Sequence, residues 1–458
     1  MPVQSLCSYL QLLTMPTPSL LIVPARFKSG KLYSQIPTSG SGDFTVTRAT
    51  AATRVNASGF IESVASGIPR LDYFASGGTV GCPALLVEAS GTNGILNSQD
   101  TATNWNLGAN LSSGYVDVIG VSGNNITVAV SGSGIGSNAG VLRRISNNVA
   151  LASGSTYTLS FLLKKTGTHT IAGYYAVITG AAAGDLGAAF NVSGSFSSGQ
   201  IYNTAGTTNR IRRVEQWGTD VYRCSETFTM TASGTLTQLG LGPTTAVNNA
   251  SHPAVGLGIA FAAPQIELGA VPTTFIPTTT AAVTRNAEVV TVSGAVSGSI
   301  GQTEGTIYCE FAYFGTPAVR SGPVFLRQAD LRGLSINFAP TDSPAGIRFS
   351  SRNNAGETAL NIVSGTLQIG TYYKIAIAYD AGGTAAGGSQ ASGVVAYVNG
   401  VQTNIGTFRV PDAAGLTQFW MYAANSGSSN DPFNGRIRAV ALYTERLTNE
   451  QLAALTAP

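Results

Sequence analysis

Charged side chains are scarce in this sequence: only 10% of its 458 residues are Asp, Glu, Lys or Arg, and the formal net charge is +3. Surface positions of helices favour Glu, Lys, Gln and Arg, so this scarcity argues against a helical protein. So small a net charge also lacks the clustered basic footprint that nucleic-acid-binding proteins need. We therefore expect neither a helical fold nor a nucleic-acid partner.

Histidine and cysteine are nearly absent as well, with 2 and 4 residues. His169 and His252 are too few for a histidine-based metal site, and neither lies near a serine elbow or a metal-ligand spacing. The four cysteines are far apart and contain no CxxC pair, so we predict small buried hydrophobic residues rather than zinc ligands or a disulfide framework. With no recognisable catalytic triad, we predict that the protein is not an enzyme.

Long apolar runs are also missing. The apolar stretch at residues 6–13 is too short to span a bilayer, and it lacks the preceding Lys or Arg of a secretory signal. We therefore predict no membrane insertion, and we expect residues 1–14 to be an extension ahead of the main architecture.

Glycine is abundant instead, with 55 residues, and aromatic and β-branched residues recur along the whole chain. This mixture is typical of short strands joined by Gly, Ser and Asn turns. Apolar and polar residues alternate in residues 156–164 and 222–230, and Asn399-Gly400 between alternating segments predicts a tight hairpin. A single helix is expected near the C-terminus, capped by Thr448. The fold class is therefore predicted to be all-β.

The length of the chain suggests several domains, and we divide it into three. Residues 1–95 form a β-rich N-terminal region whose strands are too short and sparse to bury a core of their own. Residues 96–285 contain eight or so strands with turns between them, which is typical of a jelly-roll sandwich. Residues 286–458 read as a further β-sandwich.

Six short phrases in the first 105 residues form a recognisable pattern. They are TRAT at 47–50, TRVN at 53–56, PRLDY at 69–73, LLVE at 85–88, TN at 92–93 and NW at 104–105. The pattern resembles an N-terminal module of bacteriophage structural proteins, including tail and head fibre proteins. Gly91 departs from it, since Arg is more common before the TN pair.

That resemblance implies a location on the virion surface after assembly in the host cytoplasm, which fits the lack of a signal sequence. Residues 1–95 would then be a region for virion attachment and oligomerisation that contacts other virion proteins. By analogy with fibres, we expect a homotrimer.

The two later units resemble other families. The phrase WGTDVYRCSETFTM at 217–230 and the ending at 263–285 are similar to jelly rolls of carbohydrate-binding modules. The phrases YYKIAIAYD, VVAYVNGV and FNGRIRAVALYTERLTNEQLAAL are similar to laminin-G or concanavalin A-like sandwiches. Both resemblances imply host-surface glycans as partners.

A sugar ring stacks its apolar face on an exposed aromatic side chain, so aromatic residues are the candidates for glycan binding. For several of them, a place in the sandwich core is the alternative. Adjacent tyrosines on a strand point to opposite faces, so at least one of such a pair should face outward. The candidates are Trp105, Tyr174, Tyr175, Trp217, Tyr222 and Trp420.

Oxygen-bearing residues raise two further hypotheses. Laminin-G-type folds sometimes hold Ca²⁺ at the sandwich rim, and Asp380, Asn430 and Asp431 are the candidates here, with a hydrogen-bonded Asx-turn loop as the alternative. No other cofactor is expected. Glu215 and Asp220 are close enough in sequence for a carboxylate pair, and salt bridges to neighbouring arginines are the alternative.

The sequence therefore predicts a bacteriophage virion protein, whether fibre, spike or capsid decoration, that displays β-sandwiches for glycan binding and host adhesion. Two alternatives remain open. One is a tailspike that depolymerises polysaccharide, and the other is a decoration protein that only stabilises the particle.

Overall fold

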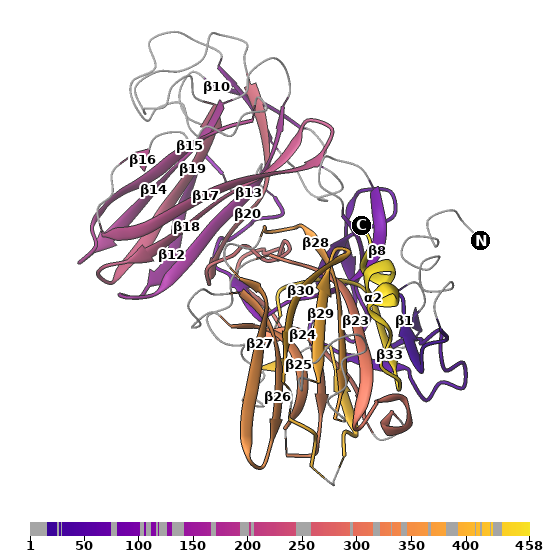
Figure 1. Ribbon diagram of the computed structural model, residues 1–458. Coiled ribbons are helices and arrows are strands. Elements are labelled where there is room, and N and C mark those ends of the chain that lie inside the picture. Colours follow the sequence, from indigo (N-terminus) through magenta and orange to yellow (C-terminus); the bar gives the residue numbers. More distant parts are fainter. Residues whose placement is uncertain are drawn as a thin grey trace.

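The computed structural model describes most of the chain. The described residues are 16–24, 27–28, 30–74, 80–100, 105–106, 111–115, 118, 126–130, 142–165, 171–192, 201–202, 206–243, 258–293, 296–314, 321–330, 332–339, 346–364, 368–381, 393–407, 409–412, 415–421, 423–424 and 433–458. Their regular structure is almost entirely β, arranged as two sandwiches (Figure 1). This confirms the predicted fold class.

The middle sandwich consists of two antiparallel sheets that enclose one apolar core. The strands of its first sheet, in order across the sheet, are β10 (Leu111–Tyr115), β11 (Ile126–Val130), β20 (Gly258–Leu268), β13 (Thr156–Lys165), β18 (Val221–Met230) and β17 (Thr207–Gly218). Those of its second sheet are β12 (Leu142–Leu151), β19 (Gly234–Pro243), β14 (Ile171–Gly180), β15 (Gly184–Asn191) and β16 (Ile201–Tyr202).

The outer face of the first sheet is covered too. β13 and β18 are buried at nearly every position instead of at every second one. A second apolar cluster explains this, because Trp217 and Leu162 on that face pack with Phe275 and with Val55 of a small hairpin. The hairpin is formed by β5 (Ala52–Val55) and β6 (Ile61–Val64).

The C-terminal sandwich also has two sheets around one core. Its first sheet runs β30 (Val401–Gly406), β29 (Val394–Val398), β28 (Tyr372–Asp380), β23 (Glu304–Tyr313), β33 (Gly435–Tyr443), β8 (Val80–Val87) and β7 (Leu71–Phe74), with β1 (Leu20–Ile22) on the same β33. Its second runs β2 (Phe27–Lys28), β3 (Lys31–Leu32), β4 (Phe44–Thr47), β22 (Val289–Ser293), β31 (Gln418–Trp420), β24 (Ser321–Arg327), β25 (Gly333–Ala339), β26 (Gly346–Asn353) and β27 (Gly356–Ser364), with β32 (Ala423–Ala424) paired to β24. A short 3₁₀ turn, Ser297–Ser299, lies between β22 and β23.

Strands from the start of the chain are integral to this C-terminal sandwich. β1 pairs with β33 through Leu20 and Leu442, and β4 pairs with β22 through Val46 and Val290. The structure therefore places most strands of the expected N-terminal region, residues 1–95, inside the sandwich expected at 286–458, with the β5–β6 hairpin and β9 as the exceptions. These N-terminal strands are short and have little apolar area of their own. They pair within the same chain because the strands of residues 286–458 leave open edges in both sheets. In the sequence, the middle sandwich is inserted between the two parts of the chain that form the C-terminal sandwich. In space, the two sandwiches lie beside each other (Figure 1).

The structure tests three local predictions: a hairpin, a helix cap and the state of the cysteines. The Asn399-Gly400 turn joins β29 to β30 with both residues at positive φ, which confirms the hairpin. The helix α2 (Asn449–Thr456) begins with a capping box between Thr448 and Gln451, which confirms the predicted cap. Cys224 and Cys309 are buried and free, as expected, but Cys82 is disulfide-bonded, so the cysteine prediction was wrong there.

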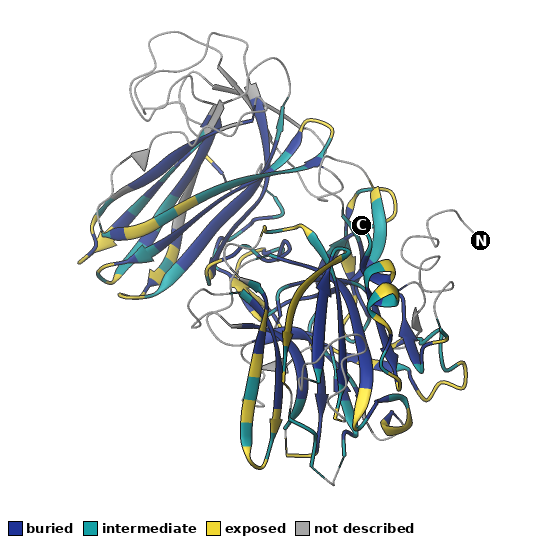
Figure 2. Ribbon diagram, in the orientation of Figure 1, coloured by how far each residue is buried: buried dark blue, intermediate teal, exposed yellow. Residues whose placement is uncertain are grey.

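One ribbon connects the two sandwiches. It consists of β9 (Gly91–Asn93) and β21 (Val283–Arg285), the segments by which the chain enters and leaves the middle sandwich. Both sandwiches are buried along most of their strands and exposed at their turns (Figure 2). Among the described residues, no helix has the length and hydropathy to cross a membrane.

This strand sharing predicts how fragments behave. A fragment of residues 91–285 keeps both sheets and the core of the middle sandwich, so it should unfold cooperatively when heated. A fragment of residues 286–458 lacks β1, β4, β7 and β8 and should not, because their apolar residues complete its core. Circular dichroism during heating measures both. A cooperative transition of the second fragment near the melting temperature of the whole chain would contradict the assignment.

Candidate binding site between the two sandwiches

A network of fully buried charges lies at the base of the connecting ribbon. Arg70 contacts Glu288 at 2.7 Å and Glu88 at 2.9 Å, and Arg48 contacts Glu288 at 3.0 Å. Arg285 lies 3.7 Å from Glu88 and 3.6 Å from Glu288. None of these side chains is more than 1% exposed. The opposite charges compensate one another where water cannot.

The network joins segments that are far apart in sequence. Arg48, Arg70 and Glu88 come from the phrases TRAT, PRLDY and LLVE, and Arg285 and Glu288 follow the middle sandwich. Three of the six phrases that resemble the phage module therefore converge on one cluster. Their charged residues hold the chain where it enters and leaves the middle sandwich.

Glu88 also fixes the returning connection. The backbone N–H and the hydroxyl of Thr274 each donate a hydrogen bond of 2.7 Å to its carboxylate. Burial raises the pKa of the Glu88 carboxyl, but Arg285, Arg70 and the Thr274 hydrogen bonds outweigh burial and bring that pKa down to about 2. Glu88 is therefore ionised and cannot serve as a proton donor near neutral pH.

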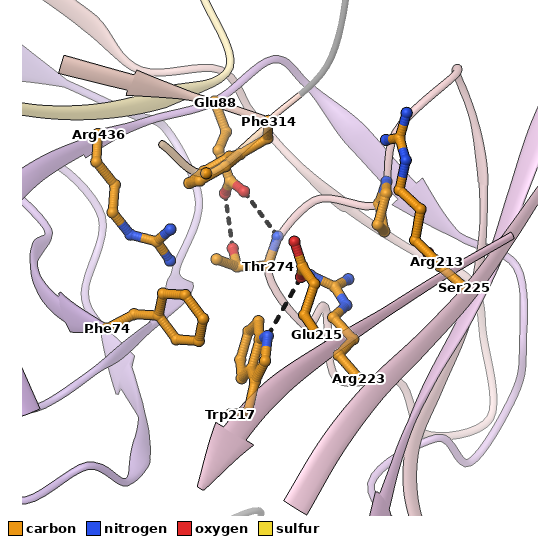
Figure 3. Close-up of a pocket in the computed structure, with 12 residues that line it drawn as sticks. Phe74, Glu88, Arg213, Glu215, Trp217, Arg223, Ser225, Thr274, Phe314 and Arg436 are labelled. Carbon is orange, nitrogen blue, oxygen red and sulfur yellow. Dashed lines mark hydrogen bonds between the residues drawn. The ribbon is translucent and has the colours of Figure 1, made fainter. Parts of the chain in front are cut away.

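Next to this network is a crevice between the two sandwiches (Figure 3). One wall is the outer face of β17 and β18. In their register Arg213 lies opposite Ser225, and Glu215 lies opposite Arg223. Strand alternation brings these side chains to one face, and Trp217 joins them at a β-bulge.

The other wall belongs to the C-terminal sandwich. Phe74 ends β7, Phe314 follows β23, and Arg436 lies on β33. The guanidinium of Arg436 lies 4.4 Å from the centroid of each phenyl ring and 2.5 Å from a carboxylate oxygen of Asp72. The crevice thus exists only when both sandwiches are in place.

Contacts across the crevice order its aromatic and charged groups. The rings of Phe74 and Trp217 lie 5.0 Å apart, and Arg223 lies 5.3 Å from the indole centroid. The indole N–H donates to Glu215 at 3.3 Å. The space that remains is about 30 Å³, enough for a water or two or for one carboxylate-sized group.

The two arginines of the first wall are poorly solvated. Burial lowers the pKa of Arg223 and of Arg213, and the nearby carboxylate of Glu215 opposes this effect at both. A guanidinium is not deprotonated in proteins, so both side chains are cations. Arg223 donates to the hydroxyl of Ser160 at 3.2 Å and to the carbonyl of Thr273, neither of which is charged.

A second hollow, of about 620 Å³, opens on the side of the middle sandwich near Tyr157 and Leu268. Its lining is mostly aliphatic, with Thr92 and Asn148 as its polar side chains. The Tyr157 hydroxyl already accepts a bond from the backbone N–H of Ala152. This hollow has no charged side chain and few converging polar side chains in its lining. The crevice is therefore the stronger candidate for a specific site.

The structure separates the six aromatic candidates. Trp105 and Tyr174 are buried at 5% and 2% exposure in the core of the middle sandwich, so neither presents a ring face to a ligand. The Tyr174 hydroxyl donates to Glu226, which Arg210 also binds. Core positions on alternating strands look the same in sequence as exposed ones, which explains this difference from expectation.

The other four candidates occupy four different places. Tyr175 is half-buried on the opposite face from Tyr174, as strand alternation predicts. Tyr222 faces the core side of β18, with Lys165 5.4 Å from its ring, and Trp420 lies on the C-terminal sandwich beside Arg327. Of the six candidates, only Trp217 lines the crevice, where its side chain is 8% exposed.

The carboxylate and metal hypotheses are only partly covered by the structure. Asp220 pairs with Lys165 at 3.6 Å, and Glu215 accepts a hydrogen bond from Trp217, so each of the two carboxylates has its own partner. Asn430 and Asp431 lie outside the described residues, and Asp380 ends β28. Within the described part of the chain no group of three metal-binding side chains occurs, and Ca²⁺ stays a prediction.

Sequence reasoning missed half of the crevice. Phe74 and Arg436 lie more than 140 residues from Trp217 in the sequence, and Phe314 follows an ordinary buried strand. The alternation of Arg213, Glu215 and Trp217 was a usable signal for the other half, because it places all three on one face of a strand.

Comparison with known proteins supports the predicted fold of the C-terminal sandwich. Residues 311–453, less than half of the chain, match the family model of the concanavalin A-like lectin/glucanases superfamily. This confirms the concanavalin A-like prediction for the C-terminal sandwich. No curated protein matches the chain.

Solved structures show only a distant likeness. A carbohydrate-binding module of a Ruminococcus gnavus sialidase, bound to α2,3-sialyllactose, is 13% identical over 36% of this chain and 88% of its own, with a TM-score of 0.29. Domain 4 of a Geobacillus stearothermophilus extracellular arabinanase, in complex with arabinotriose, is 17% identical over 37% and 73%, with a TM-score of 0.28. Trypanosoma rangeli sialidase in complex with sialic acid is 11% identical over 90% and 77%, with a TM-score of 0.25. These values carry no argument about function.

The buried network predicts a large effect of removing one charge. Glu288→Gln should lower the free energy of unfolding by about 3–5 kcal/mol, because it leaves buried arginines without their counter-charge. The matched control is Glu62→Gln, since Glu62 forms a 2.7 Å pair with Arg54 but is 37% exposed, and its loss should cost less than about 1 kcal/mol. Urea unfolding measures both, and equal effects would show that the network does not stabilise the fold.

Acid should reveal the depressed pKa of Glu88. Its carboxyl titrates near 4.5 in an unfolded chain and near 2 in the folded one, so its stabilising effect is complete above about pH 4.5 and is lost as the pH falls toward 2. Glu88→Gln should therefore differ most from the natural protein at neutral pH. The difference in unfolding free energy, followed by urea unfolding from pH 7 to pH 3, should stay constant down to about pH 5 and shrink below it. A difference that stays constant down to pH 3 would contradict the assigned ion pairs.

Proposed function

We propose that this chain is a non-enzymatic bacteriophage virion protein that displays two β-sandwiches and binds glycans through the crevice between them. The observation that carries the proposal is that Trp217, Arg213 and Glu215 of the middle sandwich line one crevice with the aromatic wall of the C-terminal sandwich. Aromatic surface with a few converging polar groups is the typical composition of a small-molecule site. The lectin-type family of residues 311–453 is consistent with a saccharide as the ligand.

The chemistry of the crevice supports binding rather than hydrolysis. Glycoside hydrolysis in most families needs one protonated carboxyl group and a second carboxylate. Glu88 and Glu215 are the carboxylates of this crevice, and Glu88 is held ionised by its arginines. Glu88 therefore cannot serve as the acid of such a reaction.

The virion location rests on the resemblance of the six N-terminal phrases to phage structural proteins. The shared structural reason for three of them, the buried network, supports reading them as one module. On a virion, many copies would bind weakly and together, and multivalency raises the overall affinity without any new contact.

The homotrimer and the contacts with other virion proteins are proposals that depend on the resemblance alone. The expected need of the N-terminal strands for an outside partner no longer supports them, because those strands pair within the chain.

A glycan array tests binding. The natural protein should be retained on at least one class of glycan, and Trp217→Leu should weaken that retention at least about tenfold, which corresponds to about 1.4 kcal/mol. Tyr222→Leu is the matched control, because Tyr222 lies on the neighbouring strand but faces the core. It should leave retention unchanged at temperatures where it stays folded.

Two outcomes would contradict the proposal. Loss of viscosity of a capsular polysaccharide on incubation with the purified protein would favour a depolymerase. Retention on no glycan, together with virions that adsorb normally but tolerate heat poorly when the protein is missing, would favour a decoration protein.

A further inference from the structure

The charged side chains of the crevice differ in whether they form ion pairs. Arg436 is paired with Asp72 at 2.5 Å, and Glu88 is paired with Arg70 at 2.9 Å and with Arg285. Among the described residues, neither Arg213 nor Arg223 has a carboxylate within 4.0 Å. The nearby carboxylates of Glu215 and Glu267 act on Arg223 only from a longer distance, and the Glu215 carboxylate accepts a hydrogen bond from the indole.

The environment makes the guanidinium groups of Arg213 and Arg223 selective. Arg223 is 8% exposed, and its guanidinium lies against the indole of Trp217. Apolar walls of Phe74, Trp217 and Phe314 keep the local dielectric low, so a charge that enters interacts more strongly with the arginines than it would in water. A guanidinium also matches the two oxygens of a carboxylate, which is why arginine predominates in sites for that group.

The size of the crevice limits what can enter. A volume of about 30 Å³ excludes a sugar ring but admits a carboxylate. A ring attached to that carboxylate would remain outside the crevice.

From charge, environment and size together we infer that the crevice binds the carboxylate of an acidic saccharide, with Arg213 and Arg223 as its recognition groups. This inference deepens the proposed function and rests on it. It assigns specificity to the β17–β18 face of the middle sandwich and orientation of the ligand to the aromatic wall opposite.

The test compares saccharides that differ only in charge. Oligosaccharides containing glucuronate, galacturonate or sialic acid are presented beside their methyl esters, which keep the ring and remove the carboxylate charge. The natural protein should retain at least one acidic form at least tenfold more strongly than its ester, and raising the salt concentration should reduce that preference.

Three variants locate the effect. Arg213→Gln should abolish the preference for the acid over the ester, and Arg213→Lys should restore part of it, because it keeps the charge but loses the fork geometry. Arg332→Gln is the matched control, since Arg332 is a partly exposed arginine paired with Asp330 and Asp412 on the C-terminal sandwich, and it should leave the preference intact. Thermal melting shows that each variant is folded.

The possible failures are distinguishable. Equal retention of acids and esters, or an unchanged preference in Arg213→Gln, overturns the inference while leaving glycan binding in place. Retention of no saccharide, acidic or esterified, overturns the proposed function itself.

Discussion

Three arginines and two glutamates, all removed from water, hold this molecule together at the point where its two sandwiches meet. A charge in such a place is stable only beside its counter-charges, because the cost of removing it from water exceeds the value of any one contact. Arg70 contacts both glutamates, and each glutamate contacts at least two arginines. Separating the segments would leave several charges uncompensated at once, so the chain enters and leaves the middle sandwich at a fixed geometry.

The crevice depends on that geometry. One of its walls is the outer face of β17 and β18, and the other is the end of the C-terminal sandwich, so neither sandwich alone forms the site. Glu88 belongs to the network and lines the crevice as well. A site whose walls are already fixed does not spend binding free energy on ordering them, which favours affinity from few contacts. The network and the candidate site are in this sense one structural unit.

Much of the fold could be predicted from the sequence, because it follows from local rules. Alternation along strands, the Asn399-Gly400 turn and the cap at Thr448 each involve only neighbouring residues. The partners of the N-terminal strands could not be predicted, since pairing between Leu20 and Leu442 joins opposite ends of the chain and leaves no local trace. In the candidate site, the wall formed by β17 and β18 could have been predicted from the alternation of side chains along β17.

The structural roles of the six N-terminal phrases could not be predicted from the sequence pattern either. Arg70 in PRLDY reads as a surface charge by composition, yet it is fully buried. Gly91, the departure from the phage pattern, has a structural reason here: a Cβ at that position would come within 2.5 Å of a carboxylate oxygen of Glu267. Such reasons depend on atoms brought together by the complete fold.

Hydrogen–deuterium exchange of the whole chain, with and without a bound acidic oligosaccharide, tests the central claim most directly. The account predicts that the ligand protects backbone amides of β17 and β18 together with those around Phe74, Phe314 and Arg436, since the ligand contacts both walls at once. Protection confined to the hollow near Leu268, or to strands of the C-terminal sandwich away from the crevice, would contradict this account.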